Sequence, residues 1–287
     1  MQVRNGPLGL HVVEDGDASA PPVLLLHGIT SSHRTWDWLV PELADRFRVL
    51  RLDFRGHGRS DRAPDAYTPD GYVSDAVAVL EQVTGPAVVI GHSLGGATTA
   101  ALTQQRPELL VGALMEDPPL GATSPRETIS LEGNALLDGF RLMRESIPQM
   151  QTSKIPLDAL VDILAAAPDT TGAGTFGEIL HPDGIRTMAA GMLEVDASVL
   201  DPVLTGTTPA FLDPTVPFGV PSVVVTADPS KPDAVADPEV GRHYAALSAD
   251  VEVIVVTGAG HLIHDEKASR ATFLTTVMSL LDRLVLA

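Results

Sequence analysis

The sequence predicts an α/β fold with a mostly parallel sheet that helices cover on both faces. Short apolar runs rich in β-branched residues alternate along the chain with segments of helical spacing, which is typical of parallel sheets. Several runs are apolar throughout, as expected of strands buried on both faces. A chain of 287 residues, of which 44% are hydrophobic, is long enough to bury such a core.

The first part of the chain contains five expected strands with helices between them. Apolar runs predict strands at 8–13, 23–26, 47–52, 87–90 and 110–115. Helices are expected to open at Trp36, to span 69–83, and to follow the fourth strand as far as Arg106, before Pro107. We find no internal repeat, so this alternation describes one continuous sheet.

A long middle segment interrupts the alternation. Residues 122–213 contain helical stretches at 136–147, 157–166 and 184–195 and many Gly, Pro and Thr residues. Strands at 221–226 and 251–256 and a last helix over about 267–286 then resume the pattern. A block inserted between two strands is expected over the carboxyl ends of the sheet, where open α/β folds bind ligands. We therefore predict a core domain formed by 1–121 and 214–287 and a helical cap formed by 122–213.

Composition excludes several classes of partner. The chain carries 37 acidic and 19 basic residues, a net charge of −18, which argues against nucleic acid or an anionic membrane surface as a partner. It has no cysteine, so thiolate catalysis and cysteine-based zinc sites are excluded. The first residues lack a signal pattern and no apolar run approaches the length of a membrane span. We expect a cytoplasmic protein, monomeric or homodimeric, that acts on a small molecule.

The motif Gly-His-Ser-Leu-Gly-Gly at 91–96 follows an apolar strand and opens a helix. This pattern predicts a sharp strand-to-helix bend that holds the Ser93 hydroxyl above the sheet. Gly91 and Gly95 flank the serine where a side chain would collide, and Gly96 lets the helix lie close on the strand. The helix N-terminus favours negative charge that develops beside Ser93.

Four motifs together resemble the α/β-hydrolase superfamily over essentially the whole chain. They are Leu-His-Gly at 26–28, Asp-Phe-Arg-Gly-His-Gly-Arg-Ser at 53–60, the Ser93 motif, and Gly-Ala-Gly-His at 258–261. Each motif is weak alone, but their order and spacing match the family. The resemblance implies the α/β-hydrolase fold and acyl transfer to water through a serine ester, without a cofactor. No spacing of His, Asp and Glu suggests a metal site.

His261 is the candidate base that activates Ser93. A serine hydroxyl is a poor nucleophile until a base takes its proton, and histidine has a suitable pKa. His261 lies in a Gly-rich loop directly after the strand at 251–256, so it is expected at the same edge of the sheet as Ser93. His264 is the fallback, although a position at the start of the last helix is expected for it. His27 and His57 are expected to be structural hydrogen-bonding groups.

The sequence leaves the acid open. In most of the family it follows the strand at 221–227, but the usual position falls near Ser230, so Asp228 comes early and Asp233 late. Asp117, at the end of the preceding strand, is favoured. The chain resembles zearalenone lactonases and one subgroup of haloalkane dehalogenases, which place their acid at this strand end. Asp228 is the first alternative, followed by Glu116 and Asp233. Strand alternation turns Glu116 and Asp117 to opposite faces, so only one should meet His261.

The oxyanion hole requires two main-chain donors. Leu94, directly after the nucleophile, supplies one, and by resemblance Ile29 supplies the other from the loop after the strand at 23–26. Apolar residues of the cap and of the segment after this loop are candidates for substrate binding: Trp36, Phe140, Met143 and Met192.

These residues predict a serine hydrolase for a carboxylic ester or lactone of a moderately hydrophobic small molecule. Ser93 attacks, His261 transfers the proton and Asp117 orients His261. Two alternatives stay open. The same triad serves C–C bond hydrolases, thioesterases and acyltransferases of secondary metabolism, and the fold also serves non-catalytic ligand binding.

Overall fold

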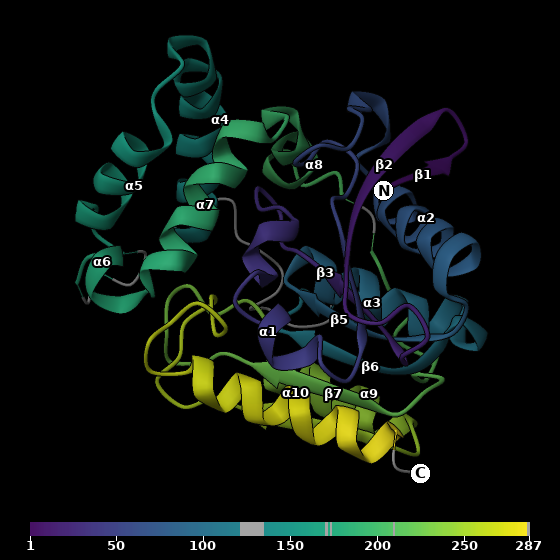
Figure 1. Cartoon of the computed structure of the whole chain (residues 1–287). Coiled ribbons are helices and arrows are strands. Elements are labelled where there is room, and N and C mark those ends of the chain that lie inside the picture. Colours follow the sequence, from purple (N-terminus) through teal and green to yellow (C-terminus); the bar gives the residue numbers. More distant parts are fainter. Residues whose placement is uncertain (121–134, 170–171, 173, 209, 286–287) are drawn as a thin grey trace.

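One sheet organises the molecule (Figure 1). The structure is a computed structural model that describes residues 1–120, 135–169, 172, 174–208 and 210–285. Within these residues, eight strands form the sheet in the order β1-β2-β4-β3-β5-β6-β7-β8. Their bounds are β1 Gln2–Asn5, β2 Leu8–Asp15, β3 Pro22–Leu26, β4 Arg48–Leu52, β5 Ala87–His92, β6 Leu110–Glu116, β7 Ser222–Thr226 and β8 Val251–Val255.

The strands from β3 to β8 run parallel, and β1 and β2 form an antiparallel edge. In the register, His92 of β5 lies opposite Glu116 of β6, and Glu116 lies opposite Val225 of β7. The ends of these strands therefore meet at one edge, and the loops that leave it lie close together. The predicted mostly parallel sheet is confirmed.

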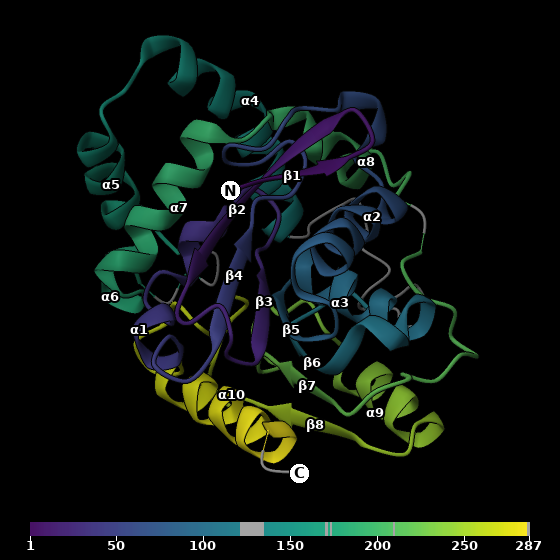
Figure 2. The ribbon, with the colours of Figure 1, turned by 45° about the vertical axis from the view of Figure 1, so that its right-hand side comes forward.

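Helices cover both faces of the sheet (Figure 2). Helices α2 (Pro69–Val79), α3 (Leu94–Gln105) and α9 (Pro238–Leu247) pack on one face, and α1 (Val40–Leu43) and α10 (Arg270–Val285) pack on the other. Alternate residues of each central strand enter the two cores. Val89 packs against the first group of helices, whereas Val88 and Ile90 pack against the second. The doubly covered sheet is confirmed.

The segment between β6 and β7 is mostly helical and lies on one side of the sheet (Figures 1 and 2). Its helices are α4 Ala135–Ser153, α5 Leu157–Ala166, α6 Phe176–Ile179, α7 Pro182–Glu194, η5 Ala197–Leu200 and α8 Asp201–Leu204. The predicted helices at 136–147, 157–166 and 184–195 are confirmed. The predicted boundary between residues 121 and 122 lies outside the described residues.

Several predicted elements differ in detail. The helix predicted to open at Trp36 is instead a 3-10 turn, η1 (His33–Trp36), that ends there and is followed by the short α1. The helix predicted over 69–83 ends as α-helix at Val79 and continues as a π-helical turn, η3 (Leu80–Thr84). Short 3-10 turns η2 (Pro64–Ala66) and η4 (Pro107–Leu109) complete the described elements. Strand β1 and helix α9 were not predicted. A four-residue edge strand is too short to show a clear period, whereas α9 does bury Val240, Gly241 and Tyr244 on one face. Among the described helices, none has the length and apolar character needed to cross a bilayer.

Candidate active site

The bend after β5 carries Ser93 at the carboxyl edge of the sheet. Ser93 has φ 51° and ψ −112°, a conformation that costs a non-glycine residue about 1–3 kcal/mol. A Cβ atom on Gly91 would lie 2.2 Å from the Gly95 carbonyl oxygen, and one on Gly95 would lie 2.2 Å from that of Leu26. The Ser93 amide donates to the Glu116 carbonyl (2.8 Å). The glycines therefore allow the close packing that holds Ser93 in this bend.

Two main-chain amides lie at the positions predicted for oxyanion donors. Leu94 is the first residue of α3, and Ile29 lies in the loop after β3 and lines the same cavity as Ser93. Within the hydrogen bonds of the described residues, neither amide donates to a protein acceptor. The next residue, Thr30, has φ 64°, and its amide is turned to His57 (3.2 Å). The amides of Ile29 and Leu94 are therefore available to an anion.

Two buried histidines brace the loop that carries Ile29. The Nδ1–H of His27 donates to the Gly28 carbonyl (2.7 Å), and its Nε2 accepts from the Phe54 amide (3.1 Å). Nε2 of His57 accepts from the Thr30 amide. Burial lowers the pKa of His27 to about 3 and that of His57 to about 4. Both rings therefore stay neutral and act as fixed hydrogen-bonding groups, as predicted.

Asp117 follows β6 directly and is fully buried. Its φ of 39° turns the carboxylate into a set of main-chain donors. Oδ1 accepts from the amides of Ala227 (3.0 Å) and Ala236 (3.1 Å), and Oδ2 accepts from the amide of Val235 (2.9 Å). Oδ2 also accepts from Nδ1–H of His261 (2.6 Å). The structure thus brings Asp117, the favoured acid, to the ring of His261.

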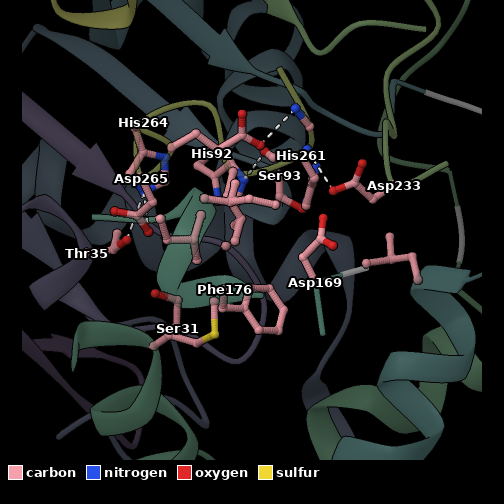
Figure 3. A pocket seen from close by; sticks show the side chains of 18 of the residues that line it. Ser31, Thr35, His92, Ser93, Asp169, Phe176, Asp233, His261, His264 and Asp265 are labelled. Atoms are coloured by element: carbon pink, nitrogen blue, oxygen red, sulfur yellow. Dashed lines mark hydrogen bonds and ion pairs between the residues drawn. The ribbon is translucent and has the colours of Figure 1, made fainter. Parts of the chain in front are cut away.

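His261 is held through its ring and its main chain. Its Nδ1–H bond to Asp117 leaves Nε2 as the ring atom that can accept a proton. The main-chain carbonyl accepts from Nε2–H of His92 (3.1 Å), and the amide donates to Asp233 (3.3 Å). Burial opposes the charged ring, but the hydrogen bond and charge of Asp117 outweigh it and raise the pKa of His261 above 6.5. Figure 3 shows Ser93 and His261 in the wall of one cavity.

The alternative acids have other partners. Asp228 is half-buried and accepts from the Ser230 amide (2.9 Å) and hydroxyl (2.7 Å) and from the Gly258 amide (2.7 Å). These bonds lower the pKa of Asp228 to about 2. Asp228 thus ties the end of β7 to the loop of His261 without contacting the ring, which corrects its place as first alternative. Asp233 contacts the His261 amide, and Glu116 contacts a different histidine.

A second carboxylate–histidine pair lies beside the first. Glu116 accepts from Nδ1–H of His264 (2.8 Å), and Nε2 of His264 is bonded to the Thr35 hydroxyl (2.9 Å). His264 therefore neither serves as base for Ser93 nor belongs to α10, which begins at Arg270. This pair was not predicted from the sequence. The signal was present in two adjacent acids at the end of one strand and two histidines three residues apart in one loop.

The cavity above Ser93 has a volume of about 430 Å³. Its floor is formed by loops at the carboxyl edge of the sheet, and its opposite wall comes from α4 to α7. Apolar side chains from these helices dominate that wall: Leu136, Phe140, Met143, Leu164, Phe176 and Met188. The cavity therefore offers a largely apolar surface opposite the hydroxyl.

Two of the four candidate substrate contacts line this cavity and two do not. Phe140 and Met143 line it. Trp36 is fully buried in the core beneath α10 and stacks on the His264 ring, with 4.7 Å between centroids. Met192 is 3% exposed and belongs to the apolar core instead. Helical spacing identifies a buried face but does not distinguish a face that packs on the core from one that lines a cavity.

Charged side chains also line the cavity. Among the described lining residues there are five carboxylates and two lysines, and no arginine: Asp169, Glu178, Asp233, Asp265, Glu266, Lys231 and Lys267. The Nζ of Lys267 already donates to the Gly177 carbonyl (2.7 Å). Burial raises the pKa of Glu266 to about 7. Carboxylates therefore outnumber lysines among the described lining residues, and Figure 3 shows Asp169 and Asp233 on the side of His261.

Two groups of side chains in the described part of the chain have the types and spacing of metal ligands: His11, His33 and Asp53, and His92, Glu116 and His264. In each group a histidine Nδ1–H is hydrogen-bonded to the carboxylate, at 2.9 Å for His33 and Asp53. In the structure, each group therefore contains a histidine–carboxylate hydrogen bond.

Comparison with known proteins agrees with this geometry. The model of the alpha/beta hydrolase family matches residues 23–273. A 2-(acetamidomethylene)succinate hydrolase of Mesorhizobium japonicum is 28% identical over 269 residues, which cover 92% of this chain and 89% of the relative. An sn-1-specific diacylglycerol lipase of Mus musculus is 26% identical, covering 92% of this chain and 82% of the relative.

Solved structures share the fold over nearly the whole chain. The crystal structure of E-2-(acetamidomethylene)succinate hydrolase superposes with a TM-score of 0.72 at 21% identity, covering 98% of both chains. An N-acyl homoserine lactone degrading enzyme superposes with a TM-score of 0.66 at 20% identity, covering 97% of this chain and 99% of the other. The sheet order, the serine bend and the family match lead to one conclusion: this chain belongs to the alpha/beta hydrolase family.

Proposed function

We propose that this protein is a serine hydrolase that cleaves a carboxylic ester or lactone of a neutral, moderately hydrophobic small molecule. One observation carries the proposal. The His261 ring donates from Nδ1 to the buried Asp117 carboxylate at 2.6 Å while lining the same cavity as Ser93. A histidine fixed in this tautomer presents a basic Nε2 to the cavity, which is what a serine nucleophile requires.

The proposed reaction has two halves. Nε2 of His261 takes the proton of the Ser93 hydroxyl as its oxygen bonds to the substrate carbonyl carbon, and the amides of Ile29 and Leu94 bind the resulting oxyanion. Each such donor stabilises the transition state by about 2.7–4 kcal/mol. His261 then returns the proton to the departing alcohol oxygen as the C–O bond breaks. In the second half, His261 deprotonates a water that attacks the acyl-enzyme, and Ser93 is released with its proton.

The substrate class follows from the cavity wall. Leu136, Phe140, Met143 and Phe176 offer an apolar surface for an acyl chain or ring, and the helices α4 to α7 serve as a cap that excludes water. The lactone-degrading and lipase relatives support ester chemistry. The family also includes a relative named for hydrolysis of a succinate derivative. Because five carboxylates and no arginine line the described cavity, a dicarboxylate substrate fits this chain poorly.

Covalent labelling tests the proposal. A fluorophosphonate probe should label the wild-type protein, and Ser93→Ala should abolish labelling and reduce hydrolysis of p-nitrophenyl butyrate by at least about 10³-fold. Ser230→Ala, which changes a serine outside the cavity, is the matched control and should be labelled like the wild type. Undiminished labelling of Ser93→Ala would refute the nucleophile.

A panel of acceptors separates the related chemistries. Partitioning of the acyl-enzyme to an added alcohol or thiol in preference to water would indicate an acyltransferase. Rapid turnover of thioesters with slow turnover of oxygen esters would indicate a thioesterase. We expect water as the acceptor and oxygen esters as the better substrates.

A further inference from the structure

Two adjacent carboxylates at the end of β6 each hold one histidine of the loop at 260–264. Asp117 accepts from the ring of His261 at 2.6 Å, and Glu116 accepts from the ring of His264 at 2.8 Å. Glu116 is the last residue of β6 and Asp117 follows it, so the loop is held at two points three residues apart. The proposed reaction uses only the first pair.

Glu116 contacts several parts of the site at once. Its main-chain carbonyl accepts from the Ser93 amide (2.8 Å), and its carboxylate accepts from the main-chain amide of His264 (2.9 Å) as well as from the ring. The carboxylate is fully buried and the His264 side chain is 1% exposed. One residue therefore joins the strand of the nucleophile, the strand of the acid and the loop of the base.

The far side of the His264 ring reaches the segment after the oxyanion loop. Nε2 is bonded to the Thr35 hydroxyl at 2.9 Å, and Thr35 lies in η1, which follows the loop that carries Ile29. The ring also stacks on Trp36, with 4.7 Å between centroids. A continuous line of contacts thus runs from Glu116 through His264 to the loop that supplies one oxyanion amide.

We propose that Glu116 and His264 are positioning residues, which hold the loop of His261 in register with Ser93 and with the oxyanion loop. This inference rests on the proposed function. Neither residue exchanges a proton with the substrate, because both ring nitrogens of His264 already have partners within the protein. Removing either partner leaves a buried polar group unpaired and lets the loop shift.

The charged surroundings of both rings define the electrostatic effect. His264 faces Glu116, Asp265 (3.5 Å), the ring of His92 and Arg270, whose Nε donates to the His264 carbonyl. Burial opposes its charged form, yet Glu116 and Asp265 raise the pKa of His264 to about 8. Glu116 and Asp265 therefore favour the charged form of the His264 ring.

His261 faces a separate set of groups: Asp117, Asp233, Glu116 and the ring of His92. The negative charge of Glu116 is one of the influences that raise the pKa of His261. Neutralising Glu116 should therefore lower that pKa.

Glu116→Gln tests the inference, with the rate of Ser93 acylation measured against pH in a p-nitrophenyl acetate burst. We expect the acylation rate constant to fall by about 10- to 100-fold, with little change in the dissociation constant of the substrate. We also expect the acidic limb of the profile to move to lower pH, because His261 loses a nearby negative charge. If Glu116 only stabilised the fold, Glu116→Gln would change neither the position of the acidic limb of the pH profile nor kcat/KM.

Asp75→Asn is the matched control, because Asp75 is another fully buried carboxylate, paired with Arg55 (2.7 Å) away from the cavity. It should lower the melting temperature but leave the acidic limb and the acylation rate unchanged. Wild-type acylation and an unmoved limb in Glu116→Gln would overturn the inference.

Thr35 provides a second test if Glu116→Gln does not fold. Thr35→Val removes the hydroxyl bonded to His264 and should slow acylation. Thr35→Ser keeps the hydroxyl and should acylate at close to the wild-type rate. Equal rates for the two variants would contradict the inference. Fluorophosphonate labelling distinguishes failure of the two proposals. Labelling of Ser93→Ala would refute the serine mechanism. If Ser93→Ala is not labelled but Glu116→Gln acylates at the wild-type rate, only the role of the positioning residues is refuted.

Discussion

At the scale of single residues, the site depends on one buried carboxylate with four donors. Asp117 accepts three main-chain amides and the ring of His261, so it cannot rotate without losing several bonds. This rigidity fixes the tautomer of the neutral His261 ring, in which Nδ1 carries the proton and Nε2 can accept one. In the proposed mechanism, the carboxylate orients the ring and stabilises the imidazolium that forms during the reaction.

Asp117→Asn should reduce kcat by about 10⁴-fold, because an amide at this position no longer selects the reactive tautomer. The pH dependence gives a second signature. The base must be neutral, so wild-type activity rises with pH through the His261 pKa, which Asp117 raises above 6.5. Without that charge, the midpoint of the limb in residual activity should fall.

Asp228→Asn is the matched variant, measured by the same assay of kcat against pH. Asp228 is half-buried and bonds to Ser230 and Gly258, not to the ring of His261, so water can replace its lost bonds and we expect near wild-type kcat and an unmoved limb. A crippled Asp228→Asn beside an active Asp117→Asn would reverse the assignment of the acid.

At the scale of elements, the strand–bend–helix unit of β5 and α3 has no room for added atoms. Gly95 lies in the first turn of α3, and a Cβ there would meet the Leu26 carbonyl oxygen at 2.2 Å and the His27 carbonyl oxygen at 2.8 Å. Both obstacles are backbone at the end of the neighbouring β3 and directly after it, which cannot move aside without disturbing the sheet.

Gly95→Ala should therefore destabilise the protein by several kcal/mol and suppress labelling of Ser93, although alanine favours helices by up to about 1 kcal/mol. Gly139→Ala is the control, because Gly139 lies inside α4 and an added Cβ there meets no atom within 4 Å. It should leave the stability unchanged or raise it by up to about 1 kcal/mol. Urea unfolding of both variants measures the contrast, and equal stabilities would contradict the steric argument.

At the scale of the whole molecule, charge and cavity agree on the class of substrate. The chain has a net charge of −18, and five carboxylates and two lysines line the described cavity. A negative potential around a cleft lowers the local concentration of anions and slows their association. The apolar wall from α4 to α7 favours neutral esters independently of charge.

We expect p-nitrophenyl butyrate to be hydrolysed with a kcat/KM at least about tenfold above that of mono-p-nitrophenyl succinate, which is similar in size but carries a carboxylate. Raising the ionic strength should narrow the difference by accelerating the anionic ester, because salt screens the repulsion. A faster succinate ester that salt slows would show instead that a cationic group receives the carboxylate.

The sequence by itself determined the fold class and identified Ser93 and His261 as the candidate nucleophile and base. Continuous apolar strands predicted the parallel sheet, and the glycines on either side of Ser93 predicted the bend, because both features can be read from short patterns in the sequence. Because His261 comes directly after a strand, the sequence predicted that it lies at the same edge of the sheet as Ser93. These properties need only the period of the pattern and the direction of the strands.

Tertiary structure alone decided which carboxylate meets which histidine. The strand order places three carboxylates at the same edge of the sheet as His261: Asp117, Glu116 and Asp228. Only Asp117, held at φ 39°, has its carboxylate within hydrogen-bonding distance of that ring. It also decided that Phe140 lines the cavity while Trp36 packs on the core. Such choices depend on distances between segments more than a hundred residues apart, and periodicity carries no information about those distances.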